Sequence, residues 1–334
     1  MEQGHIDRFF DAVQGKVIPV IGDAMLDAYI MGKVNRISPE APVPVVDVQS
    51  REYRLGGAAN VALNLKALGA EPVLIAALGD DGGADRFTAV MERHDLQTLG
   101  LIRHPKAMTT VKTRVFSQRQ QMLRLDEEDS RSIPDSLQED MSAFLAGMLH
   151  GHKPEVAVLQ DYNKGVLDQR NISALISQLR DAGVKVAVDP KRENFEAYTG
   201  IDLLKPNLKE TADIYGDNAG LLLADDATAA LPLTKQIRRK QQPTQILITL
   251  GDRGMFYSEG PNAAAKIPAE RREVADVSGA GDTVIAVAAA GMAAGMSINE
   301  WAPLANLAGG LVCEMLGVVP IDPQRLRIEA ERLA

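Results

Sequence analysis

Val156-Ala-Val-Leu-Gln160 is a short apolar run that ends directly before Asp161, and Val184-Lys-Val-Ala-Val188 ends in the same way before Asp189. Apolar runs of this length that alternate with helical patterns are typical of buried strands in a mostly parallel sheet with crossover helices. Four further runs have the same character: Val17–Gly22, Pro72–Leu78, Leu203–Lys205 and Ile246–Leu250. The sequence therefore predicts an α/β fold in which helices flank a mostly parallel central sheet.

Polar residues or glycines stand just past several of these strand ends. They are Asp23, Asp161, Asp189, Asn207 and Gly251. Ligands of such sheets bind beyond the carboxyl ends of the strands, so one shared cleft is predicted there. We expect a turn and then a helix after each strand. Pro19 lies inside the first strand and cannot donate to a ladder, so a local irregularity is expected at that point.

Three stretches read as strands without a helix between each and its neighbours: Gly32–Ile37, Pro44–Ser50 and Thr110–Gln118. They predict a small antiparallel sheet that projects as a lid, approximately residues 32–53 and 110–125, from a single domain spanning residues 1–334. A small sheet is marginal alone, and its apolar side chains need a partner surface. These side chains are Val43, Val45, Val46, Val48, Val111, Val115 and Phe116.

Composition limits the class of partner. The chain has 334 residues and a net charge of -9, which argues against a nucleic-acid-binding surface. The N-terminus lacks a basic region followed by an apolar stretch, and no apolar run approaches the length of a membrane span. We therefore expect a cytoplasmic protein with neither nucleic acid nor membrane as partner. If such an acidic chain binds phosphates, it must concentrate its cations locally.

A glycine-bearing turn leads into an apolar helical run near the C-terminal end: Ala275-Asp-Val-Ser-Gly-Ala-Gly-Asp-Thr283. A helix that begins there points unpaired N–H groups at an anion. Asp282 adds negative charge beside that anion, which makes sense if it takes a proton from a hydroxyl that attacks phosphorus. The amides of Gly279, Ala280 and Gly281 would stabilise the transferring group. The alternative is that Asp282 is an ordinary first-turn residue.

This segment resembles the C-terminal signature of the ribokinase-like (PfkB) carbohydrate kinases. Their N-terminal signature is matched by Gly56-Gly-Ala-Ala-Asn60, with Ala62, Gly69 and Gly79 at the corresponding spacing. The resemblance covers essentially the whole chain. It implies a ribokinase-like fold, phosphorylation of a small-molecule sugar, and the use of ATP and Mg²⁺, with a monovalent cation possible.

One branch of the family is matched better than the others, the heptose-7-phosphate kinases of lipopolysaccharide precursor synthesis. The similar segments are Gly22–Asp27, Gly32–Pro44, Arg54–Asn60, Gln160–Gly165 and Val188–Lys191. The resemblance implies ATP-dependent phosphorylation of the C1 hydroxyl of D-glycero-D-manno-heptose 7-phosphate, giving the 1,7-bisphosphate for ADP-heptose synthesis. In many relatives a nucleotidyltransferase domain follows, and we expect this chain to lack it.

The sugar side of the cleft is predicted from residues that suit hydroxyl groups. Carboxylates accept hydrogen bonds, amides both donate and accept, and glycines allow close approach of the backbone. The candidate sugar contacts are Asp23, Asp27, Gly56, Gly57, Asn60 and Asp161. Asp27 could instead lie on a solvated helix surface, and Asn60 could be a buried structural amide.

A phosphorylated sugar needs fixed cations, which only Arg and Lys supply readily. We favour Lys164 and Lys191, because each follows a predicted strand end near an aspartate, and Arg36, which lies in the predicted lid. Each of them could equally be a solvated surface charge.

The nucleotide side is predicted at two strand ends. Asn207-Leu-Lys-Glu210 resembles the family's Asn-x-x-Glu motif, in which Glu210 would organise Mg²⁺, through water, beside Leu208 and Lys209. The same pattern is also a variant of the helix capping box. Thr249, Gly251 and Gly254 resemble the turn beside the ribose and phosphates, and Asn306 lies on a helix that flanks the adenine in relatives.

Three other functions are alternatives to a heptose-phosphate kinase. A kinase for an unphosphorylated hexose, ribose or a nucleoside such as adenosine would use the same Asp282. A dinucleotide-binding oxidoreductase is disfavoured because the first turn, Gly22–Asp27, lacks the Gly-x-Gly-x-x-Gly pattern. A catalytically silent sugar-binding regulator should have lost the base. Because related kinases often pair their lids, the resemblance also implies a homodimer through the lid.

Overall fold

The large sheet of this computed structural model, which describes residues 2–118 and 120–334, has nine strands. Seven are parallel, and β12 and β13 are added antiparallel at one edge. In sheet order they are β13 (Ala263–Ile267), β12 (Met255–Glu259), β11 (Gln245–Thr249), β10 (Leu203–Leu204), β9 (Lys185–Asp189), β8 (Val156–Gln160), β1 (Val17–Gly22), β4 (Glu71–Gly79) and β5 (Leu101–His104). All six predicted strands are confirmed, each to within one residue at either end.

Side chains of the central strands alternate between two hydrophobic clusters, one on each face of the sheet. In β8, Val156 and Val158 belong to one cluster, whereas Ala157 and Leu159 belong to the other. This alternation follows from the period of two in a strand, and it requires a helical layer on both faces. The apolar runs of the sequence are continuous because both faces are covered.

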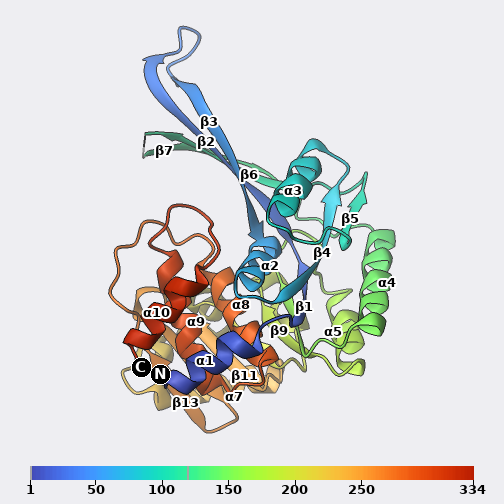
Figure 1. The fold of residues 1–334 in the computed structure, drawn as a ribbon, viewed down its shortest axis with the longest axis vertical. Coiled ribbons are helices and arrows are strands. Elements are labelled where there is room, and N and C mark those ends of the chain that lie inside the picture. The colour runs from blue at the N-terminus through green and yellow to red at the C-terminus, as the bar shows by residue number, and fades with distance from the viewer. Residues whose placement is uncertain (1, 119) are drawn as a thin grey trace.

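The helices form these two layers (Figure 1). The first layer contains α1 (Gln3–Ala12), α2 (Ala58–Ala67), α3 (Gly82–Arg93), α8 (Ala280–Ala293), α9 (Ile298–Val312) and α10 (Pro323–Arg332). The second contains α4 (Asp135–Gly151), α5 (Ile172–Asp181), α6 (Leu208–Tyr215) and α7 (Leu231–Lys240). Short 3-10 helices lie at η1 (Arg192–Ala197), η2 (Gly216–Leu223), η3 (Ala227–Ala230) and η4 (Gly251–Arg253).

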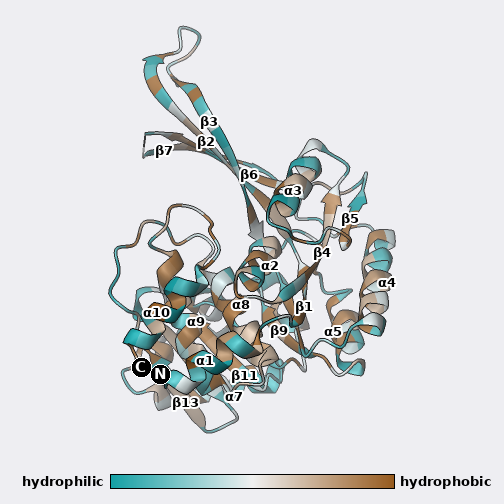
Figure 2. Cartoon of the chain, viewed as in Figure 1, coloured by the Kyte–Doolittle hydropathy of each residue, from teal (hydrophilic) through white to brown (hydrophobic). Residues whose placement is uncertain are grey.

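Helix α8 lies deepest in the first layer. Every residue from Asp282 to Ala293 is buried, and Figure 2 shows both α8 and α9 as hydrophobic along most of their length. Gly291 lets the two helices approach closely, because a Cβ there would lie 2.4 Å from the Cβ of the fully buried Trp301. The packing fixes the position of the first turn of α8 relative to the sheet.

The small sheet has the order β3-β2-β6-β7, with β2 (Ala24–Ile37), β3 (Pro44–Gly57), β6 (Thr110–Ser117) and β7 (Gln120–Glu127). Strands β2 and β6 are parallel, whereas β3 and β7 are antiparallel to their neighbours. The hairpin of β2 and β3 projects away from the large sheet (Figure 1). The sheet is therefore larger than predicted, and it is mixed rather than antiparallel.

The expectation of a helix after the first strand is wrong. Strand β2 begins at Ala24, directly after the turn at Asp23, and its residues up to Tyr29 are buried. Side chains that are buried on both faces of a pleated strand favour an extended backbone over a helix at this point. Asp27 therefore lies on a strand, and the alternative of a solvated helix surface is also wrong.

Pro19 causes no irregularity. Strand β1 pairs with β4 without a register shift from Val17 to Ile21, and its pairing with β8 begins only at Val20. At Pro19 the strand has a ladder on one side only, so its missing N–H is tolerated. In the described part of the chain, no helix combines the length and hydropathy needed to cross a bilayer.

We predict that Gly22→Ala unfolds the junction between β1 and β8. Gly22 has φ 152°, and a Cβ there would lie 2.0 Å from the carbonyl oxygen of Gln160. Because this backbone cannot move without breaking the sheet, the loss of unfolding free energy should be at least about 3 kcal/mol. Chemical denaturation measures it.

The matched control is Gly183→Ala, at φ 77° with no atom within 4 Å of the new Cβ. It carries only the backbone strain of a left-handed conformation, about 1–2 kcal/mol. Equal losses for the two variants would show that the contact with Gln160 is unimportant.

Candidate active site

The first turn of α8 lies beyond the carboxyl ends of β8 and β9. Its cap, Gly279, has φ 81°, and a Cβ there would lie 2.8 Å from the amide nitrogen of Asn60. A glycine is required both by the left-handed backbone and by the approach of α2. The backbone N–H groups of Gly281 and Asp282 have no acceptor among the described residues. The first N–H groups of a helix have no partner within the helix, so these two are available to a ligand.

Asp282 is buried, and both of its carboxylate oxygens accept hydrogen bonds. Oδ2 accepts from Asn60 Nδ2 at 2.9 Å, and Oδ1 accepts from Gln160 Nε2 at 3.1 Å and from the Tyr162 hydroxyl at 2.7 Å. Burial raises the pKa of Asp282 to about 7, although the bonds from Asn60 and Tyr162 act in the opposite direction. The carboxyl is therefore suited to gain and lose a proton near neutral pH.

A buried ion pair stands beside this carboxyl. Lys205 Nζ lies 2.9 Å from Asp189 Oδ2, and Gln160 Nε2 donates to the same Asp189 oxygen at 3.2 Å. A Cβ on Gly281 would lie 3.7 Å from Lys205 Nζ, so the ammonium is next to the turn that opens α8. The pair brings a fixed cation to this turn with little net charge.

Asp23 and Asp161 are buried and hold the segment that follows β8. Asp23 accepts backbone N–H groups from Tyr162, Lys164 and Val166 at 2.8–3.1 Å. Burial and the neighbouring Asp161 raise the pKa of Asp23 to about 6, against these hydrogen bonds. The two carboxylates, predicted as sugar contacts, thus fix the backbone that presents Tyr162 to Asp282.

Asp161 is bound in the same way. It accepts from the Asn163 N–H at 2.7 Å, the Tyr198 hydroxyl at 2.8 Å and Asn194 Nδ2 at 3.1 Å. Burial raises its pKa, and these three donors oppose that shift.

Asp27 forms an ion pair with Arg114 of the neighbouring strand β6. Burial raises the pKa of Asp27, while Arg114 acts to lower it. Gly56 leaves room for the carboxylate, because a Cβ there would lie 2.4 Å from Asp27 Oδ2. Gly57 has φ 59°, and its Cβ would lie 2.4 Å from the Asp23 carbonyl oxygen. Both glycines thus pack the base of the small sheet onto the strand end.

Asn60 is fully buried, as expected for the alternative in which it is a structural amide. It donates to Asp282 and accepts from Asn64 Nδ2 at 3.2 Å. The predicted sugar contact is thus in contact with the candidate base.

The three predicted phosphate-binding cations lie in different places. Lys164 Nζ pairs with Glu128 at 2.9 Å. Lys191 pairs with Glu210 and lies 5.1 Å from the centre of the Tyr162 ring, between the two predicted sides of the cleft. Arg36 is exposed near the turn of the β2–β3 hairpin and is not brought together with the others. The sequence does not reveal this separation, because it depends on the length of the hairpin.

Asn207 and Glu210 form a capping box at the start of α6. Asn207 Oδ1 accepts from the Glu210 N–H at 2.8 Å, and Glu210 Oε2 accepts from the Asn207 N–H at 2.9 Å. Glu210 is buried and its other oxygen binds Lys191. Leu208 is half-buried and Lys209 is exposed on the same turn.

The remaining predicted nucleotide residues lie near the β11 edge. Thr249 forms a parallel bridge with Asn207, which places both strand ends side by side. Gly251 and Gly254 have φ 65° and 89°, and a Cβ on Gly254 would lie 2.0 Å from the Ile267 carbonyl oxygen. Asn306 Nδ2 donates to the Pro268 carbonyl at 2.9 Å and so ties α9 to the segment after β13.

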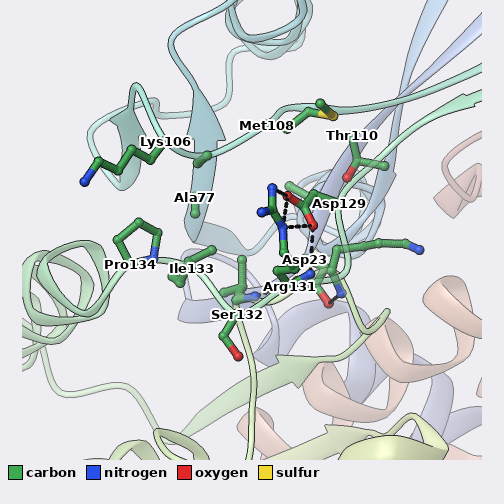
Figure 3. A pocket seen from close by; sticks show the side chains of 14 residues that line it. Asp23, Ala77, Lys106, Met108, Thr110, Asp129, Arg131, Ser132, Ile133 and Pro134 are labelled. Carbon is green, nitrogen blue, oxygen red and sulfur yellow. Dashed lines mark hydrogen bonds and ion pairs between the residues drawn. The ribbon is translucent and has the colours of Figure 1, made fainter.

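A pocket of about 200 Å³ lies beside Asp23, directly after β1 (Figure 3). Asp23, Thr110, Ser132, Lys164 and Val166 line it together with Ala77 of β4 and the segment 106–108 that follows β5. Arg131 and Asp129 pair with each other in its mouth, at 2.6 Å, and Lys106 extends away from its centre.

Metal binding was tested on the side chains present. Residues 2–118 and 120–334 contain no group of three or more His, Cys, Asp or Glu side chains that could hold a metal. Glu210 fits a Mg²⁺ ion held mainly by phosphate oxygens and water, because one carboxylate is then sufficient. Its two oxygens are engaged by Lys191 and by the Asn207 N–H, so contact through water fits better than direct ligation.

Sequence reasoning missed four side chains at the site: Arg114, Gln160, Tyr162 and Lys205. Gln160 and Tyr162 flank Asp161 at a strand end, so the rule that located Asp161 could have included them. Lys205 ends an apolar run, where a lysine is rarely buried without a partner. Arg114 carries no signal in sequence, since only the register of β2 and β6 brings it to Asp27.

Known proteins resemble this chain in sequence and in fold. The family model "pfkB family carbohydrate kinase" matches residues 16–325. Two curated relatives named "Bifunctional protein HldE" are 42% identical over 94% of this chain, from Stutzerimonas stutzeri, and 38% identical over its full length, from Pelobacter propionicus. The chain spans 63% and 67% of the length of these relatives.

Solved structures share the fold at low sequence identity. The tetrameric inhibited form of phosphofructokinase-2 from Escherichia coli has a TM-score of 0.74 and 16% identity, and the alignment covers 96% of this chain and 100% of that one. A ribokinase of Arabidopsis thaliana complexed with ribose and ATP has a TM-score of 0.69 and 16% identity, over 94% and 99%. These likenesses confirm the predicted ribokinase-like α/β fold.

We predict that Asp282→Asn stabilises the folded chain at pH 8. The pKa of this carboxyl is about 7 in the folded chain, against 3.8 for an ordinary aspartate, so the folded chain loses stability as pH rises from about 4 to about 7. A neutral side chain avoids that loss. The gain in unfolding free energy should be about 1–3 kcal/mol at pH 8 and smaller at pH 5.

Thermal denaturation at the two pH values measures the effect. Asp81→Asn is the control, because Asp81 caps α3 and hydrogen bonds hold its pKa below the usual value despite some burial. That variant should gain nothing at pH 8. Because an amide also places a donor opposite Asn60 Nδ2, the deciding quantity is the change between the two pH values: if the stability of Asp282→Asn relative to the wild type does not rise from pH 5 to pH 8, the carboxylate is not strained by burial.

Proposed function

The chain belongs to the pfkB family of carbohydrate kinases and is a sugar kinase; from this premise we propose that it phosphorylates the C1 hydroxyl of D-glycero-D-manno-heptose 7-phosphate with ATP. The product would be the 1,7-bisphosphate, an intermediate for ADP-heptose and the lipopolysaccharide core. The proposal rests on the similarity of the segments around Asp27, Gly56 and Tyr162 to heptose-phosphate kinases, and on the identity to the two curated relatives.

The observation that carries the chemistry is the buried carboxyl of Asp282 at the start of α8. In the proposed reaction this carboxylate takes the proton of the acceptor hydroxyl as its oxygen attacks the γ-phosphorus of ATP. The bond to the bridging oxygen of ADP breaks, and ADP leaves with the electron pair. The free N–H groups of Gly281 and Asp282, together with Lys205, are placed to stabilise the oxygens of the transferred group.

Tyr162 donates to the same Asp282 oxygen that must accept the substrate proton. We infer that the acceptor hydroxyl takes over this place when the sugar binds. Asn60 and Gln160 then continue to orient the carboxylate from the other directions. Asp27, Gly56 and Gly57 remain the proposed sugar contacts from the side of the small sheet.

The nucleotide is proposed to bind along the ends of β10 and β11. Lys191, predicted as a cation for the sugar phosphate, is reassigned to the nucleotide phosphates because it pairs with Glu210. Glu210, oriented by Asn207, would face the same phosphates, and Thr249, Gly251, Gly254 and Asn306 would border the ribose and adenine. Mg²⁺ supplies charge neutralisation of the phosphates when bound. An alternative within the family is a kinase for another sugar or a nucleoside, of the fructose, ribose or adenosine type.

A homodimer through the small sheet is the second part of the proposal. Apolar side chains are exposed on it, including Val48 at 45%, Leu123 at 52% and Leu125 at 49%. Every residue described in β7 is exposed, and an unpaired edge of this kind invites a partner. Phe116, predicted for the interface, is instead buried and stacks on Tyr29 at 6.3 Å. The proposed contact therefore involves β3 and β7, with each sheet also acting as a lid over its own sugar site.

For catalysis, Asp282→Asn should lower kcat by about 100-fold or more, since it removes the general base. In the wild type, kcat/KM should rise with pH through about 7, the pKa of Asp282, because only the carboxylate accepts the proton. Tyr162→Phe removes a hydrogen bond that lowers this pKa, so in that variant the rise of kcat/KM should occur at a higher pH.

A coupled assay for ADP with heptose 7-phosphate, fructose, ribose and adenosine tests both base and substrate. Asp85→Asn is the control, a first-turn aspartate of α3 on the surface, and should keep its kcat. Full turnover by Asp282→Asn would refute the base. A higher kcat/KM for one of the other acceptors would refute the heptose substrate and leave the base intact.

For assembly, Val48→Asp combined with Leu123→Asp should convert a dimer into a monomer, because charged side chains cannot be buried unpaired in an apolar interface. Sedimentation at micromolar concentration measures this. Ile328→Asp on α10, a residue with 65% exposure away from the small sheet, should leave the sedimentation coefficient unchanged. A wild-type monomer with full activity would exclude the proposed dimer.

A further inference from the structure

Two lysines share one carboxylate beneath the small sheet. Glu128, directly after β7, accepts from Lys112 Nζ at 2.5 Å through Oε2 and pairs with Lys164 Nζ at 2.9 Å through Oε1. The side chains of Lys112 and Lys164 are only 15% and 16% exposed, and that of Glu128 is 26% exposed. We call these residues the Lys112–Lys164–Glu128 cluster. Lys112 lies on β6 and Glu128 follows the paired strand β7, 16 residues further on, whereas Lys164 comes from the segment after β8.

The cluster borders the candidate active site. The Lys164 N–H binds the same Asp23 oxygen as the Tyr162 N–H, at 3.0 and 2.8 Å, and the Tyr162 hydroxyl binds Asp282. On the other side, Lys112 is the register partner of Asp27 across β2 and β6. The two ammonium groups therefore approach the sugar side from the loop after β8 and from the small sheet.

The pocket of about 200 Å³ adjoins the cluster, and Lys164 lines it (Figure 3). Thr110 lines it as well and lies two residues before Lys112 on β6, so the two side chains leave the strand on the same side. Since a water molecule takes about 30 Å³, this volume holds a phosphate group. Thr110 and Ser132 add hydroxyl donors to its wall.

The charge of the two lysines explains why Glu128 forms ion pairs with both of them. Two poorly exposed ammonium groups without a counter-ion are costly, and Glu128 neutralises part of their charge, with Asp126 a further 3.2 Å neighbour of Lys112. Burial raises the pKa of Glu128, but the hydrogen bonds from Lys112 and Lys164 outweigh it, so the pKa lies below the usual value. A phosphate monoester has more charge and more acceptor oxygens than a carboxylate, and therefore matches two lysines better.

We propose that Lys112 and Lys164 bind the phosphate of a phosphorylated sugar substrate, and that Glu128 is an internal counter-ion which this phosphate displaces. The inference rests on the proposed function in that the sugar carries a phosphate far from the reacting hydroxyl. It adds a means of selection. A sugar without a phosphate cannot release the lysines from Glu128, so it gains nothing from them.

Kinetics with heptose 7-phosphate and its dephosphorylated analogue test the proposal. For Lys112→Ala and Lys164→Ala, the ratio of kcat/KM for the phosphorylated sugar to that for the analogue should fall by roughly ten- to hundredfold, as expected for a lost charge-assisted bond. Glu128→Gln should lower KM for the phosphorylated sugar severalfold, because the side chain that competes with the phosphate for the two lysines is then uncharged. Lys185→Ala is the matched control, because this exposed lysine lies at the start of β9, the end of the strand opposite the site, and it should not change the ratio.

Binding of inorganic phosphate alone, by calorimetry and by the shift in melting temperature, keeps the test independent of the sugar and of folding defects. Phosphate should bind Glu128→Gln more tightly than the wild type and should lose affinity in Lys112→Ala. A Glu128→Gln variant with a raised KM and no gain in phosphate binding would overturn the inference, since Glu128 would then be a support. An unchanged ratio in Lys112→Ala would also overturn it.

The two proposals fail separately. If another phosphorylated sugar is preferred with the same dependence on Lys112, Lys164 and Glu128, the heptose substrate is wrong and the phosphate site is supported. If heptose 7-phosphate is the substrate and none of the three variants changes the ratio, the phosphate site is wrong and the substrate is supported.

Discussion

Asp282 places a carboxylate where water hardly reaches, and the surrounding structure supplies in its place three hydrogen-bond donors from three separate elements. Asn60 lies on α2, Gln160 is the last residue of β8, and Tyr162 lies in the segment that follows β8. The donors compensate desolvation only in part, so the pKa remains raised to about 7. A fully compensated carboxylate would be a weak base and an uncompensated one would stay protonated. The balance between burial and donors is what suits this group to proton transfer.

The donors can meet only because two layers of the fold converge at one strand end. The burial of α8 against α9 and the sheet fixes its first turn, while α2 brings Asn60 against Gly279. From the other side, Asp23 and Asp161 use buried carboxylates to hold the backbone of the segment after β8. Backbone hydrogen bonds to a buried carboxylate are hard to rearrange, since breaking one leaves an unpaired charge. Tyr162 therefore reaches Asp282 from a rigid support rather than from a mobile loop.

The strands and the position of the cleft could be predicted from sequence because a strand buried on both faces is continuously apolar, and its carboxyl end is marked by the first polar residue. Asp282 could be singled out because the glycine-bearing turn before its helix resembles the family's C-terminal signature; an acidic first turn is by itself common. No comparable sequence pattern indicates the direction in which a side chain points. Asp23 and Asp161 stand at strand ends like ligands, yet Asp23 accepts backbone N–H groups of the segment after β8, and Asp161 accepts from Asn194 and Tyr198. Arg36 fits a lid by position in the sequence, but the length of β2 carries it to the far end of the hairpin. The pairs Asp27–Arg114 and Asp189–Lys205 depend on sheet register, which single-sequence patterns do not contain.

The ion pairs around the cleft explain how a chain with a net charge of -9 would receive the two phosphorylated ligands of the proposed reaction. Cations around the cleft are already paired: Lys205 with Asp189, Lys191 with Glu210, Arg114 with Asp27, and Lys112 and Lys164 with Glu128. Each pair lowers the cost of keeping a cation poorly hydrated in the absence of ligand. An incoming phosphate then exchanges one anion for another and does not have to order and desolvate a free lysine. Because the exchange favours the partner with more charge and more acceptor oxygens, pairing also discriminates between a phosphate and a hydroxyl at the same position. Under this proposal, acidic residues at such a site do not prevent phosphate recognition. They require that a ligand bind the cations more strongly than the carboxylates do.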